Sequence, residues 1–422
     1  MDKIVIQGGR RLKGKVEISG AKNSALPVLF SSILAEGWNQ FENIPALRDI
    51  LTTCRLLEKL GLSVLLPEKK GASFRISSNG MKSYTATYDL VRTMRASVLV
   101  MGPLLARFKK AKVSLPGGCA IGARPINLHL KAFEQMGAKI DIQEGYVVAR
   151  AKKLHGARIH FDTVSVTGTE NVMMAAVLAE GETIIENAAQ EPEIADLAEV
   201  LIKMGGRISG AGTTTLTISG VKQLHGCQHH IIADRIEAGT FMIASAITAG
   251  NLVVSGIDPI FVEALSLKLR EAGTEVRLEA NGIRVIGPHT LRSVDVTTAP
   301  YPGFATDFQA QFMALMTIAD GTSVMTETIF ENRFLHAQEL LRMGAHIKIE
   351  GHSAVIQGVK RLSGAPLMAS DLRASAALIL AGLAAKGITE IHRVYHIDRG
   401  YEQIEKKLRG LGARIKRVKL KY

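Results

Sequence analysis

The sequence contains few cysteines, few aromatic side chains and no long hydrophobic run. Its three cysteines are an odd and sparse set, which argues against a disulfide framework and favours a reducing compartment. Aromatic residues make up only 5% of the chain, too few for the mixed basic and aromatic face of a nucleic-acid binder. The longest apolar helix candidate, Ala374 to Ala385, is too short to span a bilayer, and the first residues lack the apolar core of a signal peptide. We therefore expect a cytoplasmic protein with no membrane insertion.

Length and composition predict a globular protein with more than one domain. The 422 residues are 47% hydrophobic and 22% charged, so the chain can bury substantial cores, and its length favours two or more domains. Eight basic residues between Lys406 and Lys421 supply most of the formal net charge of +13. The remaining basic residues are interleaved with acidic ones, so we interpret the C-terminal run as a solvated tail and expect no nucleic-acid partner.

An internal repeat organises the chain. A helix end with a hydrophobic residue just before a glycine, followed by an alternating strand, recurs at Gly61, Gly137, Gly205, Gly273, Gly344 and Gly412. Each of these glycines suits a left-handed helix C-cap. A second helix lies upstream in each copy, is rich in small residues, and closes on a glycine in five copies, at Gly37, Gly181, Gly250, Gly321 and Gly387. The pattern predicts six units of helix, strands, second helix and strand, grouped as two compact domains of three units rather than an open solenoid.

Polar side chains stand at the predicted starts of the apolar helices. They are Lys22 and Asn23, Arg92 and Arg95, Ser165 to Thr169, Asp234 and Arg235, Thr306 and Asp307, and Asp371 and Arg373. Helix N-termini offer unpaired N–H groups and the positive end of the helix dipole, so several of them in one cleft favour phosphate and carboxylate ligands. Lys22, Arg124 and Arg399 would make such a site strongly selective for anions.

One cysteine stands in a segment that is typical of a reactive loop. Cys119 lies among Gly117, Gly118 and Gly122, with Arg124 five residues further on. The glycines let the backbone approach a ligand closely, and the guanidinium can hold an anion and lower the pKa of a nearby thiol. A small buried cysteine in a turn is the alternative. Cys54, by contrast, has helical spacing with neighbouring leucines and is predicted to lie in the core.

Eight segments, in this order, carry a family resemblance. They are Ser19–Pro27 (SGAKNSALP), Pro116–Pro125 (PGGCAIGARP), Glu191–Ile194 (EPEI), Ala233–Phe241 (ADRIEAGTF), Pro302–Asp307 (PGFATD), Ile329–Phe334 (IFENRF), Ser370–Ala374 (SDLRA) and His396–Tyr401 (HIDRGY). Together they resemble the enolpyruvyl transferase family, and within it the UDP-N-acetylglucosamine 1-carboxyvinyltransferases. The resemblance extends along nearly the whole chain.

The resemblance implies an α/β protein with the inside-out α/β barrel fold shared with 5-enolpyruvylshikimate-3-phosphate synthase. In this fold two domains, each of three βαβαββ-like units, close over the ligands. The chain is expected to cross between domains near Ala21 and near Ala233. Residues 1–21 plus 233–422 would then form a discontinuous domain, and residues 22–232 would form the domain that carries the Cys119 loop. We expect a monomer.

The resemblance also implies a reaction and the residues that perform it. The enolpyruvyl group of phosphoenolpyruvate passes to the 3-hydroxyl of UDP-N-acetylglucosamine with release of phosphate, in the first committed step of peptidoglycan synthesis and with no cofactor. Lys22, Arg124 and Arg399 would grip phosphoenolpyruvate, Asp307 would take the hydroxyl proton, and Cys119 would deliver a proton to C3 or add to C2. The residues implied to bind the nucleotide sugar are Asn23, Arg95, Pro125, Ile126, Asn127, Leu128, Ser165, Val166, Thr306, Asp307 and Ile329, and Arg373 joins the substrate-binding set.

Some features depart from the pattern or leave alternatives. Asn127 stands where some relatives carry Asp, and Thr163 where some carry Lys, which puts affinity for the nucleotide sugar in doubt. The run His225–His230 could supply metal ligands, but it lacks a second ligand cluster at zinc spacing, so we interpret it as a surface loop and expect no metal. An enzyme acting on shikimate 3-phosphate is a second hypothesis, against which the Cys119 loop argues. A non-catalytic binder of anions or nucleic acid is a third.

Overall fold

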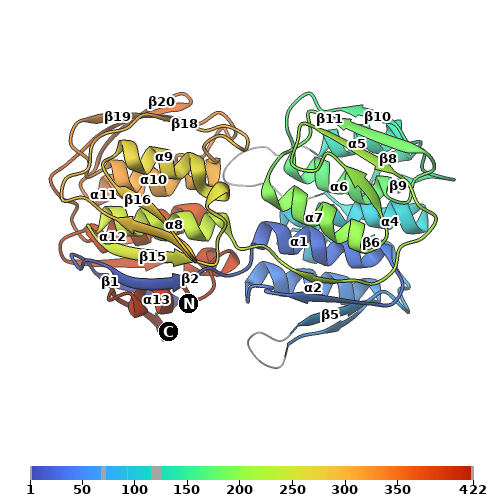
Figure 1. Ribbon diagram of the computed structural model, residues 1–422, viewed down its shortest axis with the longest axis horizontal. Coiled ribbons are helices and arrows are strands. Elements are labelled where there is room, and N and C mark those ends of the chain that lie inside the picture. The colour runs from blue at the N-terminus through green and yellow to red at the C-terminus, as the bar shows by residue number, and fades with distance from the viewer. Residues whose placement is uncertain (1, 68–72, 93, 116–125, 420–422) are drawn as a thin grey trace. The chain divides into compact units, whose positions relative to one another are not determined.

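The computed structural model describes residues 2–67, 73–92, 94–115 and 126–419, and these fall into two compact units. The discontinuous unit contains the described residues up to Ser19 and those from Ala233 onward. The continuous unit contains the described residues from Gly20 to Ile232. Figure 1 shows that each unit is built from helices with small sheets around them.

The continuous unit has three four-stranded sheets in its described residues. Their strand orders are β14-β3-β5-β4, β6-β7-β9-β8 and β10-β11-β13-β12. The strands are β3 (Trp38–Glu42), β4 (Ser63–Leu65), β5 (Phe74–Ser77), β6 (Thr85–Ala86), β7 (Lys110–Ser114), β8 (Lys139–Gln143), β9 (Tyr146–Arg150), β10 (Arg158–His160), β11 (Glu182–Glu186), β12 (Arg207–Ser209), β13 (Thr215–Ser219) and β14 (Gln228–His230). The last of these, β14, pairs in parallel with the first, β3, so the unit closes on itself.

The discontinuous unit repeats this arrangement with strands from both ends of the chain. Its sheets are β22-β23-β1-β24, β16-β17-β15-β2 and β18-β19-β21-β20. The strands are β1 (Asp2–Gln7), β2 (Lys13–Glu17), β15 (Asn251–Ser255), β16 (Glu275–Glu279), β17 (Gly282–Ile286), β18 (Val296–Thr297), β19 (Thr322–Thr326), β20 (His346–Glu350), β21 (Ser353–Gln357), β22 (Pro366–Met368), β23 (Ile388–His392) and β24 (Arg414–Lys419). Because β1 pairs with β23 and β24, and β2 pairs with β15, the N-terminal segment belongs with the second half of the chain.

The helices that the sheets enclose are apolar around their whole circumference. The helices of the continuous unit are α1 (Lys22–Ser31), α2 (Arg48–Leu60), α3 (Tyr88–Val91), α4 (Met101–Phe108), α5 (Asn127–Gln135), α6 (Val166–Ala176) and α7 (Pro192–Lys203), with 3₁₀ turns η1 (Ser32–Leu34) and η2 (Arg95–Val100). Those of the discontinuous unit are α8 (Arg235–Ile247), α9 (Glu263–Glu271), α10 (Gln309–Met316), α11 (Leu335–Arg342), α12 (Leu372–Ala384) and α13 (Ile404–Gly410), with η3 (Pro259–Val262), η4 (Thr306–Phe308) and η5 (Val394–Arg399). Every residue of α8 is buried, and α8, α10 and α12 pack against one another. These three helices therefore form the centre of the unit, as the inside-out fold requires.

The six repeat glycines all take the predicted left-handed conformation, with φ between 88° and 100°. The upstream glycines follow the prediction at four of five positions. At the fifth, Ala249 (φ 48°) adopts the left-handed conformation in place of Gly250. In the copy that lacks this glycine, Lys109 (φ 59°) does so at the end of α4.

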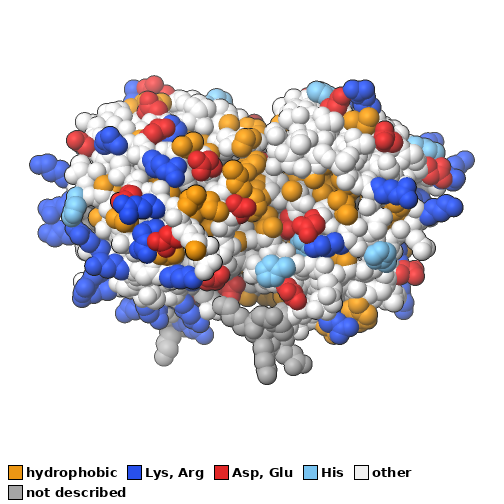
Figure 2. All heavy atoms as spheres, viewed as in Figure 1, with side chains coloured by type: hydrophobic (Ala, Val, Ile, Leu, Met, Phe, Trp, Pro, Cys, Tyr) orange, Lys and Arg blue, Asp and Glu red, His pale blue; other side chains and the backbone are white. Residues whose placement is uncertain are grey.

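The prediction of a solvated C-terminal tail is wrong for the described residues. Residues 404–410 form α13, and β24 lies at the edge of a sheet, paired antiparallel with β1. Ile415 on β24 is buried, whereas Lys416 is exposed, as are Lys13 and Lys15 on β2, an edge strand of another sheet. Figure 2 shows Lys and Arg side chains gathered over the part of this unit where Figure 1 labels β1, β2 and α13. Charges on edge strands discourage pairing with other chains, which explains a basic run that is also folded.

Among the described ranges, each helix is too short or too polar to cross a bilayer.

Candidate active site

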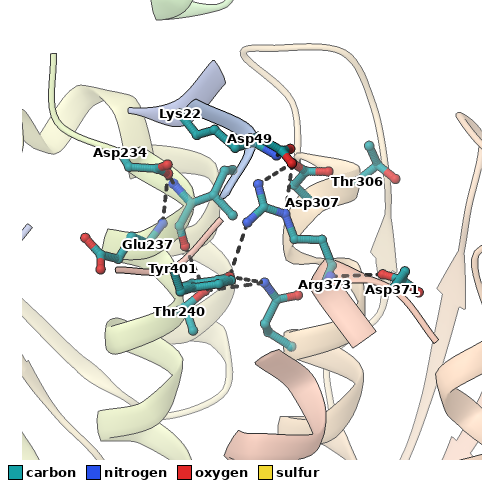
Figure 3. A network of polar contacts seen from close by, with 12 residues as sticks. Lys22, Asp49, Asp234, Glu237, Thr240, Thr306, Asp307, Asp371, Arg373 and Tyr401 are labelled. Atoms are coloured by element: carbon teal, nitrogen blue, oxygen red, sulfur yellow. Dashed lines mark hydrogen bonds and ion pairs between the residues drawn. The ribbon is translucent and has the colours of Figure 1, made fainter. Parts of the chain in front are cut away.

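Asp307 lies at the centre of an ion-pair network in the discontinuous unit (Figure 3). It belongs to η4, the 3₁₀ turn that leads into α10. Its Oδ2 accepts two hydrogen bonds from Arg373, from Nε at 3.1 Å and Nη2 at 2.8 Å. Its Oδ1 accepts one from Nη2 of Arg333 at 2.6 Å. Both guanidiniums are buried, whereas a quarter of the Asp307 side chain is exposed, so the carboxylate can still reach a ligand.

The two arginines set the charge of Asp307. Burial alone would raise the pKa of this carboxyl group, but Arg373 and Arg333 outweigh burial and hold the pKa well below its usual range. In turn, burial would lower the pKa of Arg373, and the Asp307 carboxylate raises it instead. The Asp307 carboxylate is therefore held ionised between two buried guanidiniums, which are groups that also bind anionic ligands.

A buried carboxylate, Glu327, joins two of the segments predicted to bind substrate. Its Oε2 accepts a hydrogen bond from Thr306 Oγ1 at 2.7 Å, and its Oε1 accepts from Thr298 Oγ1 at 3.0 Å. Oε1 also accepts from the backbone N–H of Ile329 at 2.8 Å and of Phe330 at 3.2 Å. Glu327 thus connects two segments: the turn that contains Asp307 and the loop that contains Ile329.

The start of α12 is fixed from two directions. Asp371 caps the helix by accepting hydrogen bonds from the backbone N–H groups of Arg373 and Ala374, at 2.9 and 3.0 Å. The guanidinium of Arg373 also donates to the hydroxyl of Tyr401 at 3.3 Å, and that hydroxyl lies 2.8 Å from Thr240 Oγ1 on α8. Burial raises the pKa of Tyr401, so its hydroxyl stays protonated. Figure 3 shows this chain leading from α8 to the Asp307 carboxylate.

In the continuous unit, Lys22 and Asn23 are the first two residues of α1, as predicted. The Lys22 ammonium is buried and donates to Asp49 Oδ2 on α2 at 3.3 Å. Lys22 lies on α1, and α1 packs against α2, so the orientation of α1 determines where this ammonium lies.

A buried histidine joins the two segments predicted to bind the nucleotide sugar within this unit. His129 follows Leu128 in α5, and its Nδ1 accepts a hydrogen bond from Asn171 Nδ2 of α6 at 3.0 Å. Its Nε2 lies 3.3 Å from Thr167 Oγ1, two residues after Ser165. Burial lowers the pKa of His129 to about 4, so the ring is neutral. Ser165 itself caps α6, accepting a hydrogen bond from Gly168 N–H at 3.1 Å, and Val166 begins the helix.

Several predicted residues cannot be compared with the structure. Cys119, Arg124 and Pro125 lie outside the described residues, and the side chain of Arg95, at the start of η2, is also not described.

Arg399 ends η5 in the discontinuous unit. Asn127 and Thr163 are both exposed. Cys54 is buried in α2, as predicted.

The surface-loop interpretation of His225–His230 is wrong for its last residues, which form β14. His229 on this strand is buried and lies near Asp196 and Glu199 of α7. Nitrogen or oxygen atoms of these three residues lie within 4.8 Å of one another, which is metal-ligand spacing. An ammonium group already lies beside this cluster, because Lys203 Nζ is 3.1 Å from His229 Nδ1 and 2.7 Å from Glu199 Oε1.

Sequence reasoning missed several side chains that shape these clusters, among them His129, Arg333, Tyr401, Glu327 and Asp49. Arg333 and Tyr401 stand within the segments that carry the family resemblance, and this was the only signal for them. Glu327 and Asp49 stand in no such segment, and only the folded chain connects them to the predicted residues.

Comparisons with known proteins agree over the full length of the chain. A family model described as EPSP synthase (3-phosphoshikimate 1-carboxyvinyltransferase) matches residues 6–408. The UDP-N-acetylglucosamine 1-carboxyvinyltransferase of Geobacter metallireducens is 60% identical over 419 residues, covering 99% of this chain and 100% of that protein. The protein of the same name from Myxococcus xanthus is 56% identical over 419 residues, with the same coverage.

Solved structures match the fold at low sequence identity. The enolpyruvyl transferase NikO from Streptomyces tendae matches with a TM-score of 0.89 at 24% identity, covering 99% of both chains. EPSP synthase from Acinetobacter baumannii matches with a TM-score of 0.75 at 20% identity, covering 99% of this chain and 100% of that one. These likenesses confirm the predicted enolpyruvyl transferase fold. The chain belongs to the enolpyruvyl transferase family, and its full-length relatives assign it to the UDP-N-acetylglucosamine 1-carboxyvinyltransferases.

Proposed function

We propose that the protein transfers the enolpyruvyl group of phosphoenolpyruvate to the 3-hydroxyl of UDP-N-acetylglucosamine and releases phosphate, the first committed step of peptidoglycan synthesis. The observation that carries this proposal is the identity of about 60% with enzymes of that name over 99% of the chain. Both substrates are multiply anionic, and the buried guanidiniums of Arg333 and Arg373 and the buried ammonium of Lys22 suit such ligands.

In this reaction Lys22, Arg124 and Arg399 hold phosphoenolpyruvate, and Cys119 delivers a proton to its C3 so that C2 becomes electrophilic. Arg373 assists in binding the substrates. The nucleotide sugar is held by Asn23, Arg95, Pro125, Ile126, Asn127, Leu128, Ser165, Val166, Thr306, Asp307 and Ile329. Two contacts support this set. Glu327 accepts hydrogen bonds from both Thr306 and Ile329, and His129, which follows Leu128, contacts Thr167 at the start of α6.

Asp307 takes the proton of the attacking hydroxyl. A carboxylate paired with two guanidiniums is a weak base, so its pairing must loosen before it accepts a proton efficiently. An anionic ligand that engages Arg373 competes with Asp307 for the guanidinium and thereby raises the pKa of the carboxyl group. Substrate binding would in this way activate the base at the moment when it is needed.

The two units serve as the two domains of the transferase, formed by residues 1–21 plus 233–422 and by residues 22–232. Strand pairing supports this division, because β1 and β2 complete sheets of the second half of the chain. The protein acts as a cytoplasmic monomer and needs neither metal nor cofactor.

A phosphate-release assay with phosphoenolpyruvate tests the proposal. Phosphate should appear when UDP-N-acetylglucosamine is added and not when shikimate 3-phosphate replaces it, with or without a chelator. Equal turnover with shikimate 3-phosphate would favour the activity for which the matching family model is named. Loss of activity with chelator would contradict the metal-free mechanism.

A further inference from the structure

A buried chain of polar side chains leads from the surface of the continuous unit to the first turn of α1. Ser24 Oγ donates a hydrogen bond to Asp196 Oδ2, and Asp196 Oδ1 lies 2.8 Å from His229 Nε2. His229 Nδ1 lies 3.1 Å from the ammonium of Lys203, which also pairs with Glu199 at 2.7 Å. The side chains of Asp196 and His229 are 1% and 2% exposed, so water does not replace these contacts.

The chemistry of the chain fixes the direction of each hydrogen bond. A lysine ammonium can only donate, so Nδ1 of His229 is the acceptor and carries no proton. Nε2 then carries the proton and donates a hydrogen bond to the Asp196 carboxylate. The second carboxylate oxygen remains free to accept from Ser24. Each member therefore has a partner, and removal of any one leaves a buried polar group without its partner.

The chain ends where a second anchor also holds α1. The N-cap residue, Ala21, has no side chain to cap the helix, and its backbone N–H donates instead to the carbonyl of Ile232 at 2.7 Å. Ile232 stands three residues after His229. The segment 229–232 thus holds both the N-cap of α1 and, through Asp196, the hydroxyl of Ser24.

The same geometry explains why these residues need not bind a metal. Asp196, Glu199 and His229 offer ligands at suitable spacing, but the Lys203 ammonium already contacts two of the three. A positive charge supplied by the protein therefore already pairs with the Glu199 carboxylate.

We propose that Asp196 and His229 are positioning residues that fix the first turn of α1 and thereby the side chains of Lys22 and Asn23. The inference rests on the proposed function, in which these two side chains hold the substrates. The Lys22 ammonium can hold a substrate only if it is correctly oriented. Ser24 lies two residues further along the same helical turn, so the hydrogen bond that holds Ser24 also orients Lys22.

Substitutions at Asp196 test the geometry of the chain. Asp196→Asn keeps both links, because the amide oxygen accepts from His229 and the amide nitrogen donates to Ser24. Asp196→Ala breaks both. We expect Asp196→Ala to raise the KM for phosphoenolpyruvate about tenfold with a smaller change in kcat, and Asp196→Asn to stay within about twofold of the wild type.

Two serines of α1 provide the matched pair that separates positioning from stability. Ser24→Ala removes the link to Asp196, whereas Ser31→Ala removes a buried hydroxyl at the other end of the helix, where it donates to the Val28 carbonyl at 2.7 Å. Both should lower the unfolding temperature by similar amounts, but only Ser24→Ala should raise the KM for phosphoenolpyruvate, by about fivefold or more. The double variant Ser24→Ala with Asp196→Ala should be no worse than Asp196→Ala alone.

The outcomes are distinct. If the wild type releases phosphate but Ser24→Ala and Asp196→Ala keep its KM, or if Ser31→Ala raises KM equally, the positioning role is wrong. If the wild type itself releases no phosphate with UDP-N-acetylglucosamine, the proposed function fails instead.

Discussion

Removing Arg333 should make Asp307 easier to protonate. Arg333 supplies one of the two guanidiniums that contact this carboxylate, at 2.6 Å, and Arg373 supplies the other. An opposite charge at this range lowers the pKa of a carboxyl group by about 1–3 units, and each unit corresponds to about 1.4 kcal/mol. Because Arg373 remains in place, we expect Arg333→Met to raise the pKa of Asp307 by about 1–2 units.

The sign of the effect on activity follows from the role of Asp307 as a base. Only the ionised carboxylate accepts a proton, so activity is lost as the pH falls through the pKa of Asp307. In the wild type this loss occurs at unusually low pH, because the pKa is held well below its usual range. In Arg333→Met it should occur at higher pH. The ratio of variant to wild-type kcat/KM, which reports the free enzyme, should therefore fall as the pH is lowered from about 6 towards about 3.

The assay is phosphate release at substrate concentrations well below KM, which gives kcat/KM, with the fraction of folded protein measured at each pH. Arg342→Met is the matched control, because Arg342 in α11 is an exposed arginine that lies 3.7 Å from Glu339 and donates to the Pro366 carbonyl at 2.8 Å. Its kcat/KM ratio to the wild type should not change with pH. A constant ratio for Arg333→Met over the same range, with the protein folded, would refute the argument that Arg333 controls the charge of Asp307.

Three further results are expected. Glu327→Gln should raise the KM for UDP-N-acetylglucosamine about tenfold, because a charge-assisted hydrogen bond that fixes the substrate turn is lost, and an unchanged KM would show that Glu327 does not organise the site. Fosfomycin, an epoxide that resembles phosphoenolpyruvate, should alkylate Cys119 alone. Burial and Glu58 raise the pKa of Cys54 to about 12, and burial raises that of Cys227 to about 11; peptide mass spectrometry that finds either of these labelled and Cys119 free would contradict this. The protein should lose stability as the pH falls from about 6.5 towards 4, because burial lowers the folded-state pKa of His129 to about 4. This histidine should account for about 2 kcal/mol of the free energy of unfolding lost between about pH 7 and about pH 5, so denaturant unfolding of His129→Asn should show a smaller loss. Equal losses in the wild type and the variant would exclude this origin.

The sequence by itself determined the repeat and the nature of the buried helices. Both are local properties: a glycine suits a left-handed C-cap wherever the helix ends, and a helix apolar all round must be enclosed. The six repeat glycines accordingly took the expected conformation, and the predicted helix Ala374–Ala385 is α12, which begins two residues earlier and ends one residue earlier. The starts of α6, α8 and α12 also fell at the predicted polar residues, because side-chain capping is decided within one turn, and α1 begins at the predicted Lys22 without such a cap.

The tertiary structure decided which charges meet and which polar residues are buried. Asp307 contacts Arg333 and Arg373, which lie 26 and 66 residues away in sequence, and no pattern along the chain assigns such partners. His229 was predicted to lie in a surface loop, because no second ligand cluster stands at zinc spacing, yet it is buried on β14 against Asp196 of α7. The basic C-terminal residues form an edge strand because β1, from the opposite end of the chain, offers hydrogen bonds to β24. Pairing of this kind depends on where the fold brings distant segments, and composition and periodicity carry no record of it.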